Sequence, residues 1–155
     1  MARTNKPKVF KMPDPASAND PALLRIDGAI ATITLNRPAA FNAIDLTIAK
    51  KLEQLSAEVE TNTDVRVLVI EGEGRAFCAG GDLGWMQAQM TADAATRRAG
   101  AAALAGMLNA LNELPKPLIG RVQGNAFGGG VGMMAVCDVA VGARGATFGL
   151  TETKL

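Results

Sequence analysis

The sequence of 155 residues contains no histidine, no tyrosine and a single tryptophan. The absence of histidine excludes a Ser-His-Asp triad, a histidine metal site and an imidazole general base. Acid–base chemistry must therefore fall to carboxylates, lysine or cysteine. With few aromatic rings and a net charge of +1, the chain is poorly equipped to stack on bases or attract phosphates. We therefore expect no nucleic-acid partner.

Cysteine is almost as scarce, because Cys78 and Cys137 are the only two and lie far apart in apolar stretches. We interpret both as core thiols of a reduced, cytoplasmic protein, since small secreted domains held by disulfides are richer in cysteine. The chain also lacks any apolar run of about 18 residues, so we expect no membrane-spanning segment. Its 48% of hydrophobic residues suffices for the core of one ordinary domain.

The amino-terminal segment, residues 1–20, is polar and includes Pro7, Pro13 and Pro15. It has no apolar stretch of the kind found in secretory signals. We predict a disordered leader over residues 1–20, with a transit peptide as the alternative. An ordered core domain is expected over residues 21–155.

Strand-like and helix-like patterns alternate along this core, which predicts an α/β fold with crossover connections. A hairpin is expected around Asp27-Gly28, and Asp45 is expected to cap a helix with one apolar stripe. The Gly-rich residues 71–81 and 124–128 are expected to be loops. The predicted strands are 24–27, 29–35, 65–70, 117–122 and 139–141, and the predicted helices are 45–61, 83–90, 92–113 and 128–137.

Two of the glycine-rich segments stand out, residues 75–82 with the sequence RAFCAGGD and residues 124–132 with the sequence GNAFGGGVG. Each is expected to follow a strand and open a helix, where backbone N–H groups have no partner in the helix. Two such ends facing each other would stabilise a developing oxyanion. Neither segment ends in Gly-Lys-Ser/Thr, so a phosphate-binding P-loop is not indicated. The alternative is that the glycines only permit turns and close packing.

These two segments resemble the enoyl-CoA hydratase/isomerase (crotonase) family, whose patterns there read roughly A-F-x-A-G-x-D and G-x-A-x-G-G-G. Residues 35–38 with 42–43, 137–138 and 148–155 are similar to further family segments in the same order. The resemblance covers about residues 23–155. It implies a spiral of ββα units, here incomplete, because family members continue into a C-terminal helical part.

The resemblance also implies roles for individual residues. The N–H groups of Gly81 and Gly129 would form the oxyanion hole, and Glu152 would carry the proton at Cα. Coenzyme A would be bound as part of the substrate, with no separate cofactor and no metal. The residues implied in binding it are Ala40, Asn42, Ala43, Ala79, Gly81, Asp82 and Leu83.

The chain departs from the family pattern at Gly132, where hydratases of the family carry the first of two glutamates. A single carboxylate, Glu152, suffices to move a proton between Cα and Cγ, whereas hydration needs another group to orient the water. The ending GLTETKL is most similar to hydratases of branched glutaconyl-CoA substrates in leucine or terpenoid breakdown. We therefore expect 2-enoyl-CoA hydration first, enoyl-CoA isomerisation second, and a non-catalytic binding or assembly module as the third alternative.

Family members usually assemble as trimers. The resemblance therefore implies a homo-oligomer, either a trimer or a dimer of trimers, or else a companion chain that supplies the C-terminal part. In either case we expect apolar surface to be exposed on this chain. Trp85 and Met86 are expected to border the acyl pocket.

Overall fold

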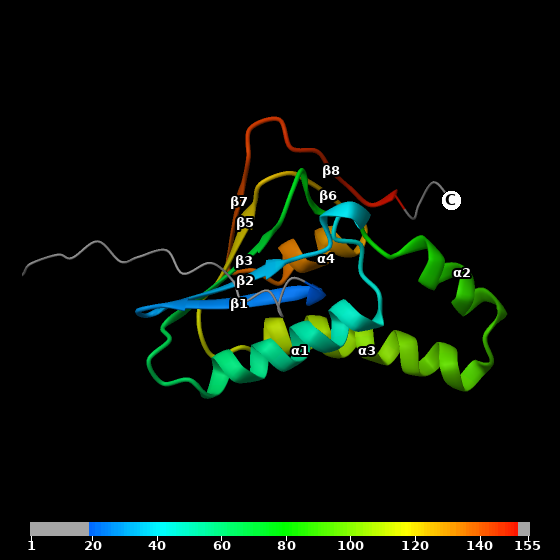
Figure 1. Cartoon of the computed structure of the whole chain (residues 1–155), viewed down its shortest axis with the longest axis horizontal. Helices are drawn as coiled ribbons and strands as arrows, with labels where there is room; N and C mark the ends of the chain where they lie inside the picture. The colour runs from blue at the N-terminus through cyan, green and yellow to red at the C-terminus, as the bar shows by residue number, and fades with distance from the viewer. Residues whose placement is uncertain (1–18, 152–155) are drawn as a thin grey trace, which may run out of the picture.

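A computed structural model of the chain describes residues 19–151 (Figure 1). Most of the predicted leader, residues 1–18, and Glu152 therefore lie outside the described residues. The described part is an α/β structure with two sheets, as the alternating sequence pattern predicts. The fold class is confirmed.

The larger sheet has five strands in the order β1-β2-β3-β5-β7. β1 and β2 form the predicted antiparallel hairpin, turning at Gly28 with a φ of +61°. The other strands pair in parallel, which requires a crossover connection between each pair. The strands span Ala22–Asp27 (β1), Ile30–Leu35 (β2), Val67–Gly72 (β3), Leu118–Val122 (β5) and Val139–Gly142 (β7).

The smaller sheet has three short parallel strands in the order β4-β6-β8. They are Ala76–Cys78 (β4), Asn125–Phe127 (β6) and Phe148–Gly149 (β8). The prediction of loops over 71–81 and 124–128 is wrong for residues 76–78 and 125–127, which form β4 and β6. Strands of three, three and two residues are too short to show the alternation that identifies a strand in sequence.

Two long helices cover one face of the larger sheet, as Figure 1 shows. α1 (Leu46–Thr61) begins at the predicted cap Asp45, and its stripe Ile48, Leu52, Leu55 and Val59 is buried. α3 (Ala94–Asn112) packs against α1 through Met107 and Leu111. These elements form the hydrophobic core on which the rest of the fold is built.

Shorter helices lie next to the two glycine-rich segments. α2 (Leu83–Thr91) begins after Asp82, and α4 (Gly129–Ala135) begins after Gly128. A 3-10 turn, η2 (Pro38–Ala40), precedes α1. Both predicted short helices are confirmed, with α4 shorter at each end than predicted.

Large apolar side chains are exposed on α2, β7 and the segment that ends in β8. Leu83 is 74% exposed, Met90 79% and Val141 61%. α2 buries none of its residues. The expected exposure of apolar surface is confirmed.

The Asp45 cap leads to a stability prediction. Its Oδ1 accepts hydrogen bonds from the Thr47 and Ile48 amides at 2.9 and 3.0 Å, and its Oδ2 lies 2.8 Å from Arg37 Nη1. Burial raises the pKa of Asp45, but hydrogen bonds from Thr47 and Ile48 and the Arg37 charge outweigh it, so the net pKa is lowered. Asp45→Ala should reduce the free energy of unfolding by about 1–2 kcal/mol.

The sign of the pH dependence follows from that lowered pKa. The stabilisation by Asp45 should be complete above its ordinary pKa of 3.8 and lost as pH falls through the lower folded value. Denaturant unfolding of wild type and variant at neutral and acidic pH measures this. Asp93, which caps α3 without a basic partner among residues 19–151, is the control, and Asp93→Ala should cost less. An Asp45→Ala loss that stays constant across pH would contradict the account.

Candidate active site

The two glycine-rich segments leave the smaller sheet at the same edge. β4 and β6 are parallel neighbours, with Ala76 opposite Asn125 and Cys78 opposite Ala126. Because carboxyl ends of parallel strands meet at one edge of a sheet, the segments that follow them lie side by side. The arrangement places the beginning of α2 and the beginning of α4 next to each other.

Glycines make this close approach possible. A Cβ on Gly80, whose φ is +94°, would lie 3.0 Å from the Phe127 carbonyl oxygen. A Cβ on Gly130 would lie 2.5 Å from the Cys78 carbonyl oxygen. The packing explanation for the glycines therefore holds at these two positions. It does not hold at Gly132, where a Cβ would meet only Leu108 Cδ1, at 3.8 Å.

Gly81 presents an unpaired amide. Ile44 forms a parallel bridge with Gly81, in which the Ile44 N–H donates to Gly80 O at 2.7 Å and the Asp82 N–H donates to Ile44 O at 2.8 Å. In such a bridge the residue opposite directs its own N–H away from the partner strand. Within residues 19–151 the Gly81 N–H meets no acceptor.

Gly129 presents a second unpaired amide. It is the first residue of α4, where an N–H has no partner within the helix. The Val131 and Gly132 amides donate to Gly128 O, whereas the Gly129 N–H donates to no group in the described part of the chain. The Ile44 Cδ1 lies 2.9 Å from where a Gly129 Cβ would be. Ile44 therefore lies beside both glycines, since its backbone bonds to the residues on either side of Gly81 and its side chain approaches Gly129.

A pocket of about 350 Å³ adjoins Gly81. It is formed by the turn before α1 and by the segment that leads into α2. Every residue that the sequence implied in coenzyme A binding lines it except Asn42, and Phe41 and Gly84 join them. The lining residues are Ala40, Phe41, Ala43, Ala79, Gly81, Asp82, Leu83 and Gly84.

Asn42 does not line the pocket, but its hydrogen bonds hold the turn that does. It is fully buried, with a φ of +56°, and its Oδ1 accepts from the Arg37 amide at 2.9 Å. Its Nδ2 donates to the carbonyl oxygens of Glu73 and Ala76, both at 2.9 Å. One amide group thus ties the turn that carries Phe41 to the first residue of β4 and to the segment before it. No sequence pattern signals these contacts, because the carbonyls lie more than thirty residues away.

Charged groups surround the same turn. Asp82 caps α2 through Trp85 N at 3.0 Å and also pairs with Arg37 at 3.2 Å. The Arg75 guanidinium lies 4.4 Å from the centroid of the Phe41 ring. Arg37 and Phe41 lie within segments that resemble the family, but neither was assigned an individual role from the sequence. The Met86 Sδ would lie 2.9 Å from a Cβ on Gly81, which places Met86 beside Gly81.

Neither cysteine has the environment of a nucleophile. Burial raises the pKa of Cys78 to about 11, against a smaller opposing effect of its hydrogen bond with the Gly80 backbone. Burial, and then the Asp138 charge, raise the pKa of Cys137 to about 11. Both thiols are protonated at neutral pH, in agreement with their interpretation as core residues.

Two other classes of site find no support in the part of the chain that the structure covers. Residues 19–151 contain no group of three or more metal-ligating side chains. Among the same residues, no helix combines the length and apolar character that a membrane crossing needs.

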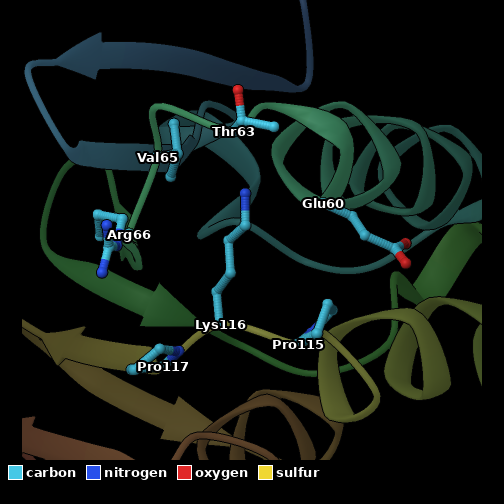
Figure 2. Close-up of a pocket in the computed structure, with 7 residues that line it drawn as sticks. All are labelled: Glu60, Thr63, Val65, Arg66, Pro115, Lys116 and Pro117. Atoms are coloured by element: carbon cyan, nitrogen blue, oxygen red, sulfur yellow. The ribbon is translucent and has the colours of Figure 1, made fainter.

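A second pocket, of about 650 Å³, involves neither glycine-rich segment. Figure 2 shows it between the end of α1 and the segment before β5, with Lys116 at its centre. The Lys116 Nζ donates to the carbonyl oxygens of Val59 and Asn62, which lie at the carboxyl end of α1. We assign Lys116 a structural role as a helix cap.

The sequence model of the enoyl-CoA hydratase/isomerase family matches residues 25–155. The chain belongs to this family, and the resemblance noted in its sequence is confirmed.

Individual relatives support the assignment to this family. The chain is 38% identical over 123 residues to enoyl-CoA hydratase AKT6-1 of Alternaria alternata, covering 79% of this chain and 39% of that protein. It is 36% identical over 137 residues to (E)-benzylidenesuccinyl-CoA hydratase of Thauera aromatica, covering 87% and 52%. The chain thus spans about half the length of these relatives, or less.

Solved structures agree in fold. An enoyl-CoA hydratase/isomerase (crotonase) structure from Legionella pneumophila superposes with a TM-score of 0.84 at 32% identity, covering 88% of this chain and 52% of that one. An enoyl-CoA hydratase from Shewanella pealeana gives 0.83 at 33% identity, covering 86% and 51%. The described residues therefore adopt a crotonase fold over about half of its usual extent.

The buried amide of Asn42 leads to a testable prediction. Asn42→Ala should lower the free energy of unfolding by about 3 kcal/mol, because buried backbone groups lose their partner. Thermal or urea unfolding measures the loss. The exposed Asn109 on α3 is the control, and Asn109→Ala should change stability by less than about 0.5 kcal/mol. Equal effects of the two substitutions would refute the assignment.

Proposed function

We propose that the protein binds an acyl-CoA thioester and stabilises its enolate. The carrying observation is the pair of unpaired amides, Gly81 and Gly129, at one edge of the smaller sheet. The thioester carbonyl oxygen would accept both N–H groups. As negative charge moves onto that oxygen, the two hydrogen bonds strengthen, which lowers the barrier to the reaction.

Coenzyme A would enter by the neighbouring pocket. We assign its binding to Ala40, Ala43, Ala79, Asp82 and Leu83, with Asn42 as the residue that holds the pocket in shape. Small side chains at most of these positions let a ligand approach the backbone. Coenzyme A is part of the substrate, and the proposal includes no metal and no separate cofactor.

Hydration of a 2-enoyl-CoA is our first proposal for the reaction. The oxygen of a water bonds to C3 as one of its O–H bonds breaks and that proton passes to the Glu152 carboxylate, while the double-bond electrons move through C2 to the carbonyl oxygen. Glu152 then returns the proton to C2 as the carbonyl re-forms, and the product has gained one water. Names of relatives such as (E)-benzylidenesuccinyl-CoA hydratase support hydration, and we extend it to branched, methylglutaconyl-like substrates.

Isomerisation is the second proposal, and Gly132 favours it. No carboxylate occurs between Gly124 and Cys137, so Glu152 has no partner there to help orient a water. A single carboxylate can take a proton from one carbon of the enolate system and return it to another. A non-catalytic binding or assembly module is the third proposal, which the lack of a carboxylate at Gly132 also supports.

We further propose that the protein works in the cytoplasm as a homo-oligomer, either a trimer or a dimer of trimers, or with a companion chain. The exposed apolar residues of β7 and α2, such as Val141 and Met90, would lie in such an interface.

Product analysis distinguishes the reactions. The protein is incubated with crotonyl-CoA, a 3-enoyl-CoA or 3-methylglutaconyl-CoA, and thioester products are identified by mass spectrometry. We expect a mass gain of one water that disappears in Glu152→Gln. Double-bond migration without a mass change would favour isomerisation instead. Failure of every thioester to bind would refute the enzyme proposal.

The Gly129 amide can be removed with little other change. Proline is compatible with the first position of a helix but has no N–H. Gly129→Pro should lower the turnover rate by about a hundred- to a thousandfold. Gly129→Ala is the matched control, because its Cβ meets the same flexible Ile44 Cδ1 while its N–H remains. Turnover measured at saturating substrate should separate the two variants, and equal rates would contradict the role of this amide.

A further inference from the structure

The strongest unassigned feature near the site is the guanidinium of Arg37. Its Nη1 lies 2.8 Å from Asp45 Oδ2 and donates to the Ala43 carbonyl oxygen at 2.8 Å. Its Nη2 donates to Asp82 Oδ2 at 3.2 Å. One side chain thus joins three groups from two separate segments of the chain.

These three groups surround the bridge that directs the Gly81 amide. Ala43 and Asp45 stand on either side of Ile44, the residue that pairs with Gly81. Asp82 follows Gly81 directly, and its own N–H donates to Ile44 O. The Ile44 N–H that bonds to Gly80 O belongs to the same peptide group as the Ala43 carbonyl, to which Arg37 donates. Arg37 therefore helps to fix the peptide between Gly80 and Gly81.

Arg37 is itself fixed in place. Its N–H donates to the buried Asn42 Oδ1, and its carbonyl oxygen accepts from the Ala40 and Asn42 amides at 3.0 and 2.9 Å. Pro38 follows it and begins η2. The backbone of Arg37 is thus part of the same turn that forms the pocket.

The Arg37 side chain is less exposed to solvent than the arginine of an ordinary surface ion pair. The Arg37 side chain is 26% exposed, whereas that of Arg121, which pairs with Glu71, is 70% exposed. Partial burial reduces screening by solvent, and the planar guanidinium can address several acceptors at fixed angles. Lysine could keep the charge but not this fork.

We infer that Arg37 is a positioning residue, which acts through Asp82 and the Ile44–Gly81 bridge to aim the Gly81 N–H at the thioester carbonyl. The inference rests on the proposed function. A positioning role can be distinguished from a merely structural one. Loss of a structural contact lowers stability, but in the molecules that remain folded it leaves the polarisation of a bound carbonyl unchanged. Loss of a positioning contact reduces that polarisation.

The test uses a thioester whose colour reports that polarisation. A para-dimethylaminocinnamoyl-CoA absorbs at longer wavelength when its carbonyl oxygen accepts strong hydrogen bonds. It is titrated into the wild-type protein and into Arg37→Gln, Arg37→Lys and the control Arg121→Gln, which removes the exposed ion pair with Glu71. Far-ultraviolet circular dichroism checks that each variant is folded.

We expect a red shift on binding to wild type and Arg121→Gln, and less than half of that shift in folded Arg37→Gln. With a substrate that is turned over, kcat of Arg37→Gln should fall about a hundredfold, which is the size of effect expected for a misplaced catalytic group. The change in KM should be smaller. Arg37→Lys should lie between the two, and it decides the question if Arg37→Gln does not fold.

A full red shift in folded Arg37→Gln or, where that variant is unfolded, in Arg37→Lys, would overturn the inference and leave the proposed function standing. Absence of binding or of any shift in wild type would instead overturn the proposed function, and the inference with it. The two failures are therefore distinguishable.

Discussion

The parallel pairing of β4 with β6 is the constraint on which the candidate site depends. It brings two segments that are about fifty residues apart in sequence to one edge of a three-stranded sheet. The contact is tight enough to exclude side chains at Gly80 and Gly130. Backbone groups therefore come close together, and the Gly81 and Gly129 amides are left without partners among the described residues. The proposed chemistry needs this combination of a rigid backbone and unused donors.

Much of the fold could be predicted from local pattern. The hairpin at Gly28 and the helix capped by Asp45 were predictable because turn chemistry, capping and apolar spacing are all properties of neighbouring residues. The smaller sheet was not, since its strands are too short for any periodicity. The sequence did identify the two glycine-rich segments, but only their pairing through β4 and β6 explains why they lie together.

The candidate site, like the fold, could be predicted from the sequence only in part. Residues of the implied pocket, such as Ala43 and Leu83, were found through a family resemblance and lie together in the structure. Asn42 was grouped with them, yet it lies behind the pocket, because burial and distant carbonyl partners cannot be seen in the sequence. Arg37 lies in a segment that resembles the family, but its role was not predicted, for a related reason. Its partners Asp45 and Asp82 each look like ordinary helix caps until the fold brings them to one guanidinium.

The central claim is that a thioester carbonyl accepts hydrogen bonds from Gly81 and Gly129. A crystal structure of the protein with a bound, unreactive acyl-CoA thioester tests it most directly. The account predicts the carbonyl oxygen about 2.7–3.1 Å from both amide nitrogens, with the coenzyme A moiety in the pocket lined by Ala43 and Leu83. A thioester bound elsewhere, or with its carbonyl turned away from either amide, would contradict it.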